Sequence, residues 1–264
     1  MVFYFLILFI IVILLLLICY PFKKEKEPFT ESEIPLKIFQ TWNTKLLPIH
    51  MKKNCKLLQK QNPQFEYYLF DDEDCLEFIH KHFDISVENA FKNLIPGAYK
   101  ADLWRYCVLY IHGGIYLDIK MKCIGDFRLI ELTKQEHYVK DRDNVEYYMP
   151  GHYGIYNAVM VQKPNNPLMM DCIHKIVENV ENKDYGFGFL YPTGPGLLGE
   201  LYEEKREKYK LPEIDLFHEE YKEVICYNDR TIMEHYPEYR KEQLIHQNDL
   251  HYAALWDRNS IYLL

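Results

Sequence analysis

The sequence predicts an α/β fold, and the order of its apolar segments carries that prediction. Residues 34–42, 65–75 and 115–123 are apolar and rich in β-branched and aromatic residues, as strands are. Residues 47–61 and 97–112 lie between them and suit helices. Strands that alternate with helices predict a sheet with helices packed on its faces.

The second strand runs into an acidic turn, DDED at 71–74. Four consecutive acidic residues could hold a metal ion. They are more typical of a solvated turn in which Asp71 or Asp72 caps the next helix, predicted over 73–82. We therefore expect a helix cap here and not a metal site.

The helix over 97–112 has clear end signals, with Pro96 just before it and Gly113 just after it. In open α/β sheets, ligands bind beyond the carboxyl ends of the strands. The first and third strands end near Trp42 and Asp118. We expect the chemistry of the protein at these two positions.

The remaining elements are a strand over 153–163, a helix over 165–182, a charged helix near 199–210 and a C-terminal tail. No repeat, low-complexity tract or change in composition divides the chain after residue 34. We predict one domain over 34–264.

A glycine-rich segment at 191–200 matches G-x-G-x-x-G through Gly194, Gly196 and Gly199. A dinucleotide-binding turn needs a strand directly before it. Pro192 interrupts that position, so we expect either a loop beside a donor or acceptor, or a plain structural turn.

The first twenty residues contain no charged side chain and, as a helix, would span about 30 Å, the thickness of a bilayer core. A signal peptide would have a shorter apolar core, a basic start and a small-residue cleavage site. We predict a transmembrane anchor over 1–20 and a charged stem over 21–33, which makes the membrane a partner.

The composition limits the other partners. The net charge of −8 gives no electrostatic support for binding a nucleic acid. The seven cysteines lack metal-type spacing, so we expect buried thiols and no disulfide framework.

Candidate site residues lie on the helix over 97–112 and the strand after it. Asp102 and Arg105 are three positions apart and share a helix face, where they could bind a sugar hydroxyl and an anion or simply form a surface ion pair. Period-two alternation places Tyr116, Asp118 and Lys120 on one strand face. A solvated strand face with a weak ion pair is the alternative.

The stretch KADLWRYCVLYIHGGIYLDIK resembles the sugar-transferase domain of glycosyltransferase family 32. That family includes yeast-type Golgi mannosyltransferases, capsular-polysaccharide enzymes and giant-virus proteins. Its pattern is D-x-x-R-Y, an apolar run and then G-G-x-Y-x-D-x-D. The matching residues are Asp102, Arg105, Tyr106, Gly113, Gly114, Tyr116 and Asp118. The resemblance extends over roughly residues 34 to 260.

The resemblance implies a GT-A type, Rossmann-like fold that binds a nucleotide-sugar. It implies transfer of a sugar from a UDP- or GDP-sugar donor to a glycan, protein or lipid acceptor, with retention at the anomeric carbon. A catalytically inactive relative that binds a nucleotide-sugar or glycan as a subunit of a complex is the competing hypothesis.

The resemblance also implies roles for single residues. Trp42 would stack on the base, Tyr116 would line the pocket, and Asp118 would be the first carboxylate of the D-x-D motif. The remaining residues would contact the donor's sugar, ribose or diphosphate, and they are Asp102, Arg105, His251 and Trp256. His251 could instead be a tail histidine, and Trp256 could be a core residue, as we expect Trp104 to be.

The sequence departs from the family at Lys120, where the motif has its second aspartate. A protonated lysine cannot ligate Mn²⁺ or Mg²⁺. Three alternatives stay open: Lys120 itself stabilises the leaving diphosphate as a catalytic residue with Asp118 and Arg105; a divalent cation is held by Asp118 with His251 or Asp249; or activity is lost.

The location is also open. The anchor predicts a single-pass protein of a Golgi/ER-type or viral-host membrane. Family precedent implies a lumenal domain, whereas the lysines that follow the anchor, Lys23, Lys24 and Lys26, favour a cytosolic one.

Overall fold

The computed structural model describes residues 32–142, 154–219, 222–246 and 250–263. Residues Ser32–Leu264 form one compact unit. The predicted anchor over 1–20 and nearly all of the predicted stem lie outside the described residues. Within the described ranges, no helix is both long and apolar enough to cross a membrane.

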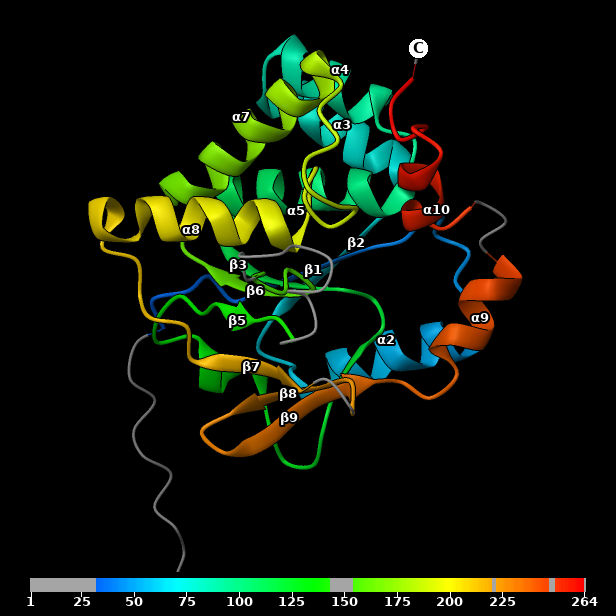
Figure 1. Cartoon of the computed structure of the whole chain (residues 1–264). Helices are drawn as coiled ribbons and strands as arrows, with labels where there is room; N and C mark the ends of the chain where they lie inside the picture. The colour runs from blue at the N-terminus through cyan, green and yellow to red at the C-terminus, as the bar shows by residue number, and fades with distance from the viewer. Residues whose placement is uncertain (1–31, 143–153, 220–221, 247–249, 264) are drawn as a thin grey trace, which may run out of the picture. The chain divides into compact units, whose positions relative to one another are not determined.

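A central four-stranded sheet confirms the predicted α/β class. Its strands are β1 (Lys37–Thr41), β2 (Glu66–Phe70), β3 (Gly114–Leu117) and β6 (Val159–Gln162). The spatial order is β2-β1-β3-β6, with β1 parallel to β2 and β3, and β6 antiparallel to β3. The parallel strands end at the same edge of the sheet, where Trp42 and Asp118 follow them (Figure 1).

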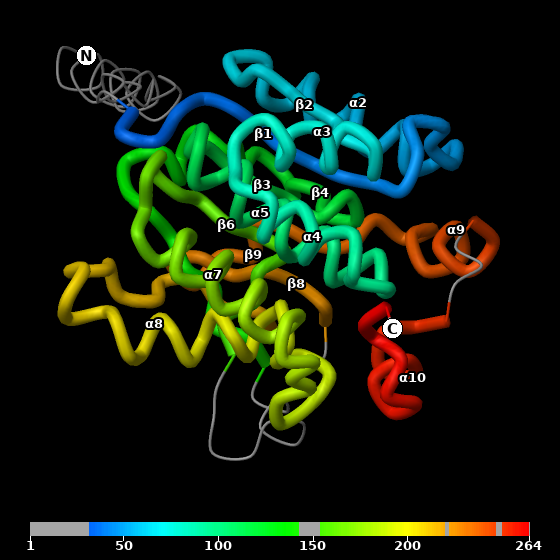
Figure 2. Tube along the Cα trace, turned by 90° about the horizontal axis from the view of Figure 1, so that it is seen from above, coloured from blue at the N-terminus to red at the C-terminus, as the bar shows by residue number. Residues whose placement is uncertain are grey.

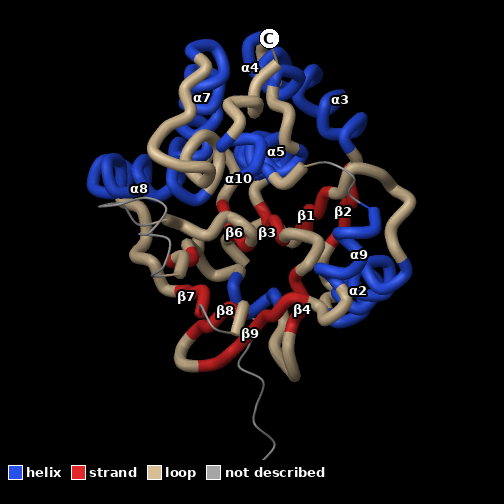
Figure 3. The backbone as a smooth tube through the Cα atoms, turned by 45° about the vertical axis from the view of Figure 1, so that its right-hand side comes forward, coloured by secondary structure: helices blue, strands red, loops and turns tan. Residues whose placement is uncertain are grey.

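Helices cover one face of this sheet. They are α3 (Asp72–His82), α4 (Ile85–Asn93), α5 (Gly97–His112), α7 (Pro167–Asn182) and α8 (Pro195–Tyr209). Figure 3 shows α3, α4, α5 and α7 on the same side of the strands, while α2 (Ile49–Gln61) lies on the other side. The sequence predicted most of these helices, missed α4, and placed the start of α8 several residues too late.

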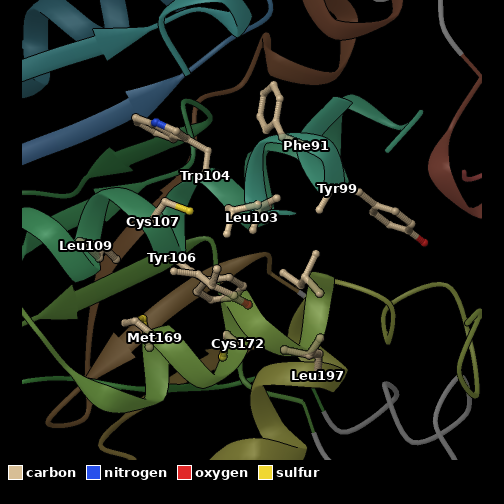
Figure 4. Close-up of a cluster of buried hydrophobic side chains, with 14 of the residues drawn as sticks. Phe91, Tyr99, Leu103, Trp104, Tyr106, Cys107, Leu109, Met169, Cys172 and Leu197 are labelled. Atoms are coloured by element: carbon tan, nitrogen blue, oxygen red, sulfur yellow. The ribbon is translucent and has the colours of Figure 1, made fainter. Parts of the chain in front are cut away.

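The core is centred on α5, of whose sixteen residues nine are buried. Trp104, Tyr106 and Cys107 are completely buried, which confirms Trp104 as a core residue. They pack with Met169, Cys172 and Leu197 from α7 and α8, as the close-up in Figure 4 shows. The six cysteines of the described residues are free thiols and five of them are buried, in agreement with the expected absence of a disulfide framework among them.

The acidic turn is a helix cap, as expected. The Asp71 side chain accepts a hydrogen bond from the Asp74 backbone N–H at 3.0 Å, and the Asp74 side chain accepts one from the Asp71 N–H at 3.1 Å. This reciprocal capping satisfies two N–H groups at the start of α3 that have no partner within the helix.

The glycine pair that ends α5 places β3 against β1. Gly113 has φ +59° and ends the helix, and Gly114 has φ +105°. A Cβ on Gly114 would lie 2.8 Å from the backbone oxygen of Lys37. Only glycine fits here without strain, because both the backbone conformation and the neighbouring strand exclude a side chain.

The predicted continuous strand over 115–123 is wrong. β3 ends at Leu117, and the Met121 N–H donates to the Asp118 carbonyl at 2.9 Å, which closes a turn. The next strand, β4 (Met121–Cys123), belongs to a different sheet. Two short strands around a turn show the same apolar alternation as one long strand, so the pattern could not separate them. Asp118 and Lys120 therefore do not share a strand face.

The second sheet comprises β4, β5 (Val139–Lys140), β7 (Leu216–Glu219), β8 (Val224–Tyr227) and β9 (Arg230–His235), in the order β4-β9-β8-β7-β5. It is followed by α9 (Tyr239–His246) and α10 (Tyr252–Asp257). The sequence treated this C-terminal part as a tail. Figure 2 shows that α9 and α10 instead fold back onto the domain, where α9 contacts α2 and α10 contacts α5.

Candidate functional site

A cavity of about 500 Å³ lies at the carboxyl edge of the central sheet. This volume is in the usual range for small-molecule sites. Its walls come from the end of β1, from α3 to α5, from the end of β3, and from α9 and α10. The residues predicted from the sequence that line it are Trp42, Arg105, Tyr116, Asp118 and His251.

Asp118 is held from three directions. The Tyr116 hydroxyl donates to its Oδ1 at 2.9 Å, and Arg105 Nη2 lies 3.4 Å from the same oxygen. Lys120 Nζ lies 2.9 Å from Oδ2. Burial alone would raise the pKa of Asp118, but the charges of Lys120 and Arg105 outweigh it and hold the pKa well below its usual value. Asp118 is therefore an anion with both oxygens engaged.

Arg105 connects the helix to the strand end. Its guanidinium contacts Asp102 at 3.1 Å, donates to the Asn157 carbonyl at 2.7 Å, and lies over the Tyr116 ring at 4.5 Å. The residue is only 5% exposed. This burial excludes the surface ion pair considered from the sequence, and it fixes the positive charge at the cavity wall.

Asp102 lies behind the cavity wall and not on it. Its carboxylate accepts hydrogen bonds from the Thr193 hydroxyl at 2.7 Å and from the Asn157 side-chain amide at 3.0 Å. Burial raises the pKa of Asp102, and Arg105 offsets this only in part. Asp102 thus orients Arg105 and anchors the loop before α8, whereas direct contact with a donor sugar stays a prediction.

The glycine-rich segment has a structural place in the same network. No strand directly precedes it, and Gly194 is the N-cap of α8. A Cβ on Gly194 would lie 3.1 Å from Asp102 Oδ2, so the loop approaches the carboxylate closely. The arrangement fits the interpretation as a loop near the site and not as a dinucleotide-binding turn.

Lys120 lies directly beyond the cavity wall. Its Nζ is 5.3 Å from the centre of the Tyr156 ring, and its side chain is 15% exposed. Burial opposes its charge, but the ion pair with Asp118 raises the pKa of Lys120 well above its ordinary value. The ammonium is therefore a permanent charge next to Asp118, the carboxylate that the motif retains.

Trp42 combines a position on the cavity wall with a core environment. The residue is 6% exposed and packs with Met51, Cys55 and Tyr239. Its place after β1 matches the sequence prediction, because it lies at the same sheet edge as Asp118. Stacking of its indole on a base is a prediction that no contact in the structure tests.

His251 and Trp256 lie on the C-terminal segment but in different environments. His251 lines the cavity, and its Nδ1 accepts a hydrogen bond from the Ala253 N–H at 3.3 Å as the cap of α10. The Trp256 indole N–H donates to the Tyr185 carbonyl at 2.8 Å, and the side chain packs against the hydrophobic core around α5. The structure brings His251, but not Trp256, to the cavity wall.

Sequence inspection missed the residues that hold these groups in place. Asn157 and Thr193 buttress Asp102 and Arg105, and Glu242 attaches α9 to α2. None of them belongs to a local motif. Only their burial, with exposed fractions of 4%, 0% and 6%, distinguishes them.

The described residues contain no group of three or more His, Cys, Asp or Glu side chains placed to hold one metal ion. Of the two residues predicted as ligands, Asp118 already binds two cationic side chains, and the Nδ1 of His251 caps a helix. Asp249, the other residue considered, lies outside the described residues.

Comparison with known proteins places residues 48–141 in the glycosyltransferase sugar-binding region that contains a DXD motif. Inositol phosphoceramide mannosyltransferase 3 of Schizosaccharomyces pombe is 29% identical over 191 residues, which are 70% of this chain and 48% of that protein. An uncharacterized glycosyltransferase of Acanthamoeba polyphaga mimivirus is 33% identical over 147 residues, 54% of this chain and 55% of that protein. The chain thus spans about half the length of these relatives.

Solved glycosyltransferase domains match this chain at low identity. The PaToxG glycosyltransferase has a TM-score of 0.48 and 18% identity, and covers 70% of this chain and 82% of its own. The UDP-bound glycosyltransferase domain of the YGT toxin has a TM-score of 0.46 and 9% identity, and covers 87% and 90%. Both scores lie below 0.5, so no feature of the site is transferred from these structures.

Proposed function

Because this chain belongs to the family 32-type glycosyltransferases with a DXD sugar-binding region, we propose that it transfers a hexose, with mannose favoured, from a nucleoside-diphosphate donor. The observation that carries the proposal is the meeting of Arg105 and Asp118 at the wall of the cavity. A carboxylate accepts hydrogen bonds from sugar hydroxyls, and a guanidinium binds the adjacent phosphates. The cavity presents both groups side by side.

The donor would lie across the cavity with its base toward Trp42 and its sugar toward Asp118. Breaking the glycosidic bond adds negative charge to the leaving diphosphate, and preorganised positive groups lower the barrier by stabilising it. Arg105 is buried and fixed by four contacts, so it needs no reorganisation during the reaction.

We extend the proposal to retention of configuration, which the family resemblance supports. The anomeric configuration of the first product, followed by NMR before mutarotation, tests this point. An inverted product contradicts retention without affecting the assignment as a transferase.

The acceptor we propose is a lipid with a polar headgroup. Two relatives from Schizosaccharomyces pombe are named inositol phosphoceramide mannosyltransferases. The cavity rim supports the idea, because three of its lining residues are exposed and apolar: Leu244 at 81%, Leu250 at 49% and Ile95 at 39%. Transfer to inositol phosphoceramide in mixed micelles, compared with transfer to soluble mannosides, tests it.

We also propose that residues 1–20 anchor the domain in a membrane of Golgi/ER or viral-host type, which would keep it close to such an acceptor. The support is the uncharged apolar sequence of this segment. Carbonate extraction of membranes that carry the full chain tests the anchor, and protease protection reports the side on which the domain lies.

The main experiment is a nucleotide-sugar panel. We expect GDP-mannose, or failing that one UDP-hexose, to raise the melting temperature of the wild-type chain and to be consumed in a transfer assay. Asp118→Asn, a nearly isosteric change, should abolish transfer. Stabilisation without turnover would favour the inactive relative, and no stabilisation by any donor would contradict the proposal.

A further inference from the structure

The family motif implies a divalent cation at Asp118, but the residues present do not fit one. Both oxygens of this carboxylate already face a cation: Oδ1 is 3.4 Å from Arg105 Nη2, and Oδ2 is 2.9 Å from Lys120 Nζ. A metal ion at either oxygen would meet the repulsion of both side chains. Where the family has the second metal-binding aspartate, this chain has the ammonium itself.

We propose that Lys120 is the resident cation of the donor site, so that the protein binds its nucleoside-diphosphate donor without a divalent metal. The proposal rests on the proposed function, because it concerns the same cavity and the same donor. The Lys120 ammonium then supplies the positive charge at the diphosphate that a metal ion would otherwise supply.

The turn that carries Lys120 is held rigidly. The Asn54 side-chain amide donates to the carbonyls of Ile119 at 3.2 Å and Met121 at 2.9 Å, and the Tyr236 N–H donates to the carbonyl of Lys120 at 3.0 Å. The Gln40 side chain also donates to the Asp118 carbonyl at 3.3 Å. A backbone fixed at four carbonyls places the ammonium reproducibly, as a functional charge requires.

The surroundings of the ammonium favour a permanent positive charge. Asp118 is its direct counter-ion, and the electron-rich face of Tyr156 lies 5.3 Å from Nζ. An ammonium carries three N–H donors. Asp118 and Tyr156 lie against Nζ, and in the proposed complex a phosphate oxygen accepts a further N–H of Lys120.

The described cluster is neutral without a metal. Asp102 pairs with Arg105 and Asp118 pairs with Lys120, which gives two carboxylates and two permanent cations in contact. Each of these two carboxylates already has a cationic partner, so neither is available as an unpaired ligand for a divalent ion.

Manganese titration followed by electron paramagnetic resonance tests the proposal directly. The wild-type chain should bind no Mn²⁺ at millimolar concentration, and its affinity for GDP and UDP should change less than twofold between EDTA and Mn²⁺. Lys120→Asp, which restores the D-x-D pattern, should gain a manganese site and make nucleotide binding depend on Mn²⁺.

Two methionine variants separate the site from general stability. Lys120→Met should weaken the affinity for the preferred nucleotide at least tenfold in EDTA. Lys122→Met is the matched control, because Lys122 also forms an ion pair at 2.9 Å, but with Glu234 and not with a carboxylate that lines the cavity. It should leave the affinity unchanged within twofold, and Lys120→Arg should retain most of it.

A wild-type manganese site that disappears in Asp118→Asn would overturn the proposal, as would nucleotide binding that requires Mn²⁺. The metal titration answers this question whether or not a donor binds. A wild-type chain that binds no nucleotide under either condition would instead refute the proposed function.

Discussion

Arg105 Nη2 lies 3.4 Å from Asp118 Oδ1, so that a helix and the end of a strand meet at one carboxylate. The arginine is buried, and it also contacts Asp102 and the Asn157 carbonyl. Removal of one partner from a buried ion pair leaves an uncompensated charge, which costs about 3–5 kcal/mol. The site is therefore part of the stability of the domain.

Arg105→Met should lower the free energy of unfolding by about 3–5 kcal/mol, because two carboxylates lose their counter-ion. Arg105→Lys should cost less, since it keeps the charge but not the planar set of donors. Urea unfolding measures both. Arg206→Met is the control, because Arg206 is a half-exposed arginine of α8, and it should change stability by less than about 0.5 kcal/mol. If Arg105→Met and Arg206→Met lowered the free energy of unfolding equally, the buried ion pairs of Arg105 would not stabilise the domain.

Asp118→Asn should destabilise the protein at pH 7 by roughly 2–3 kcal/mol, below the ~3–5 kcal/mol of a fully buried pair because both partners keep some exposure. The folded-state pKa of Asp118 is lowered, so its stabilising contribution is present above the unfolded pKa of about 3.9 and disappears as the pH falls through the folded pKa. Wild type and variant should thus converge in stability below pH 4. A constant difference from pH 7 to pH 2 would show that the charge of Asp118 contributes nothing.

Trp42→Phe should weaken nucleotide binding by roughly threefold to tenfold, because a smaller ring stacks less well than an indole; full removal of a stacking ring costs ~1–3 kcal/mol. Trp256→Phe serves as the comparison, since its indole bonds to the Tyr185 carbonyl and does not line the cavity. We expect its nucleotide affinity to equal that of wild type in isothermal titration. A larger loss in Trp256→Phe than in Trp42→Phe would reverse these two assignments.

Glu242→Ala should loosen α9 and reduce nucleotide affinity without a direct contact to the ligand. The carboxylate of Glu242 accepts hydrogen bonds from the N–H groups of His50 at 2.8 Å and Met51 at 2.9 Å, and so caps α2 from another helix. Loss of such a cap costs about 0.5–2 kcal/mol. Because Tyr239 on α9 lines the cavity, the looser helix should weaken binding.

Chemical denaturation and nucleotide titration of Glu242→Ala measure the two effects together. Glu207→Ala, which removes a carboxylate that is 91% exposed, should change neither quantity. Unchanged nucleotide affinity in a destabilised Glu242→Ala protein would show that α9 contributes nothing to the donor site.

Local pattern was enough to predict the first half of the fold. The helix over 97–112 matches α5 at both ends, because Pro96 and Gly113 impose its limits through their own backbone restrictions. Asp71 likewise caps α3 through residues in its own turn. The carboxyl edge of the sheet could be located in advance, since parallel strands bring their ends together whatever the rest of the chain does.

The other half depends on contacts between residues that are distant in the sequence. In the second sheet, β4 pairs with β9 and β5 pairs with β7, and these partners lie far apart along the chain, so no local signal specifies their pairing. The turn at Asp118 is buttressed by Asn54, from a helix much earlier in the sequence. Residue identity alone showed that Lys120 replaces a carboxylate. That its ammonium folds back onto Asp118, beside Arg105, follows from packing, because only the assembled domain buries the two cations at the same anion.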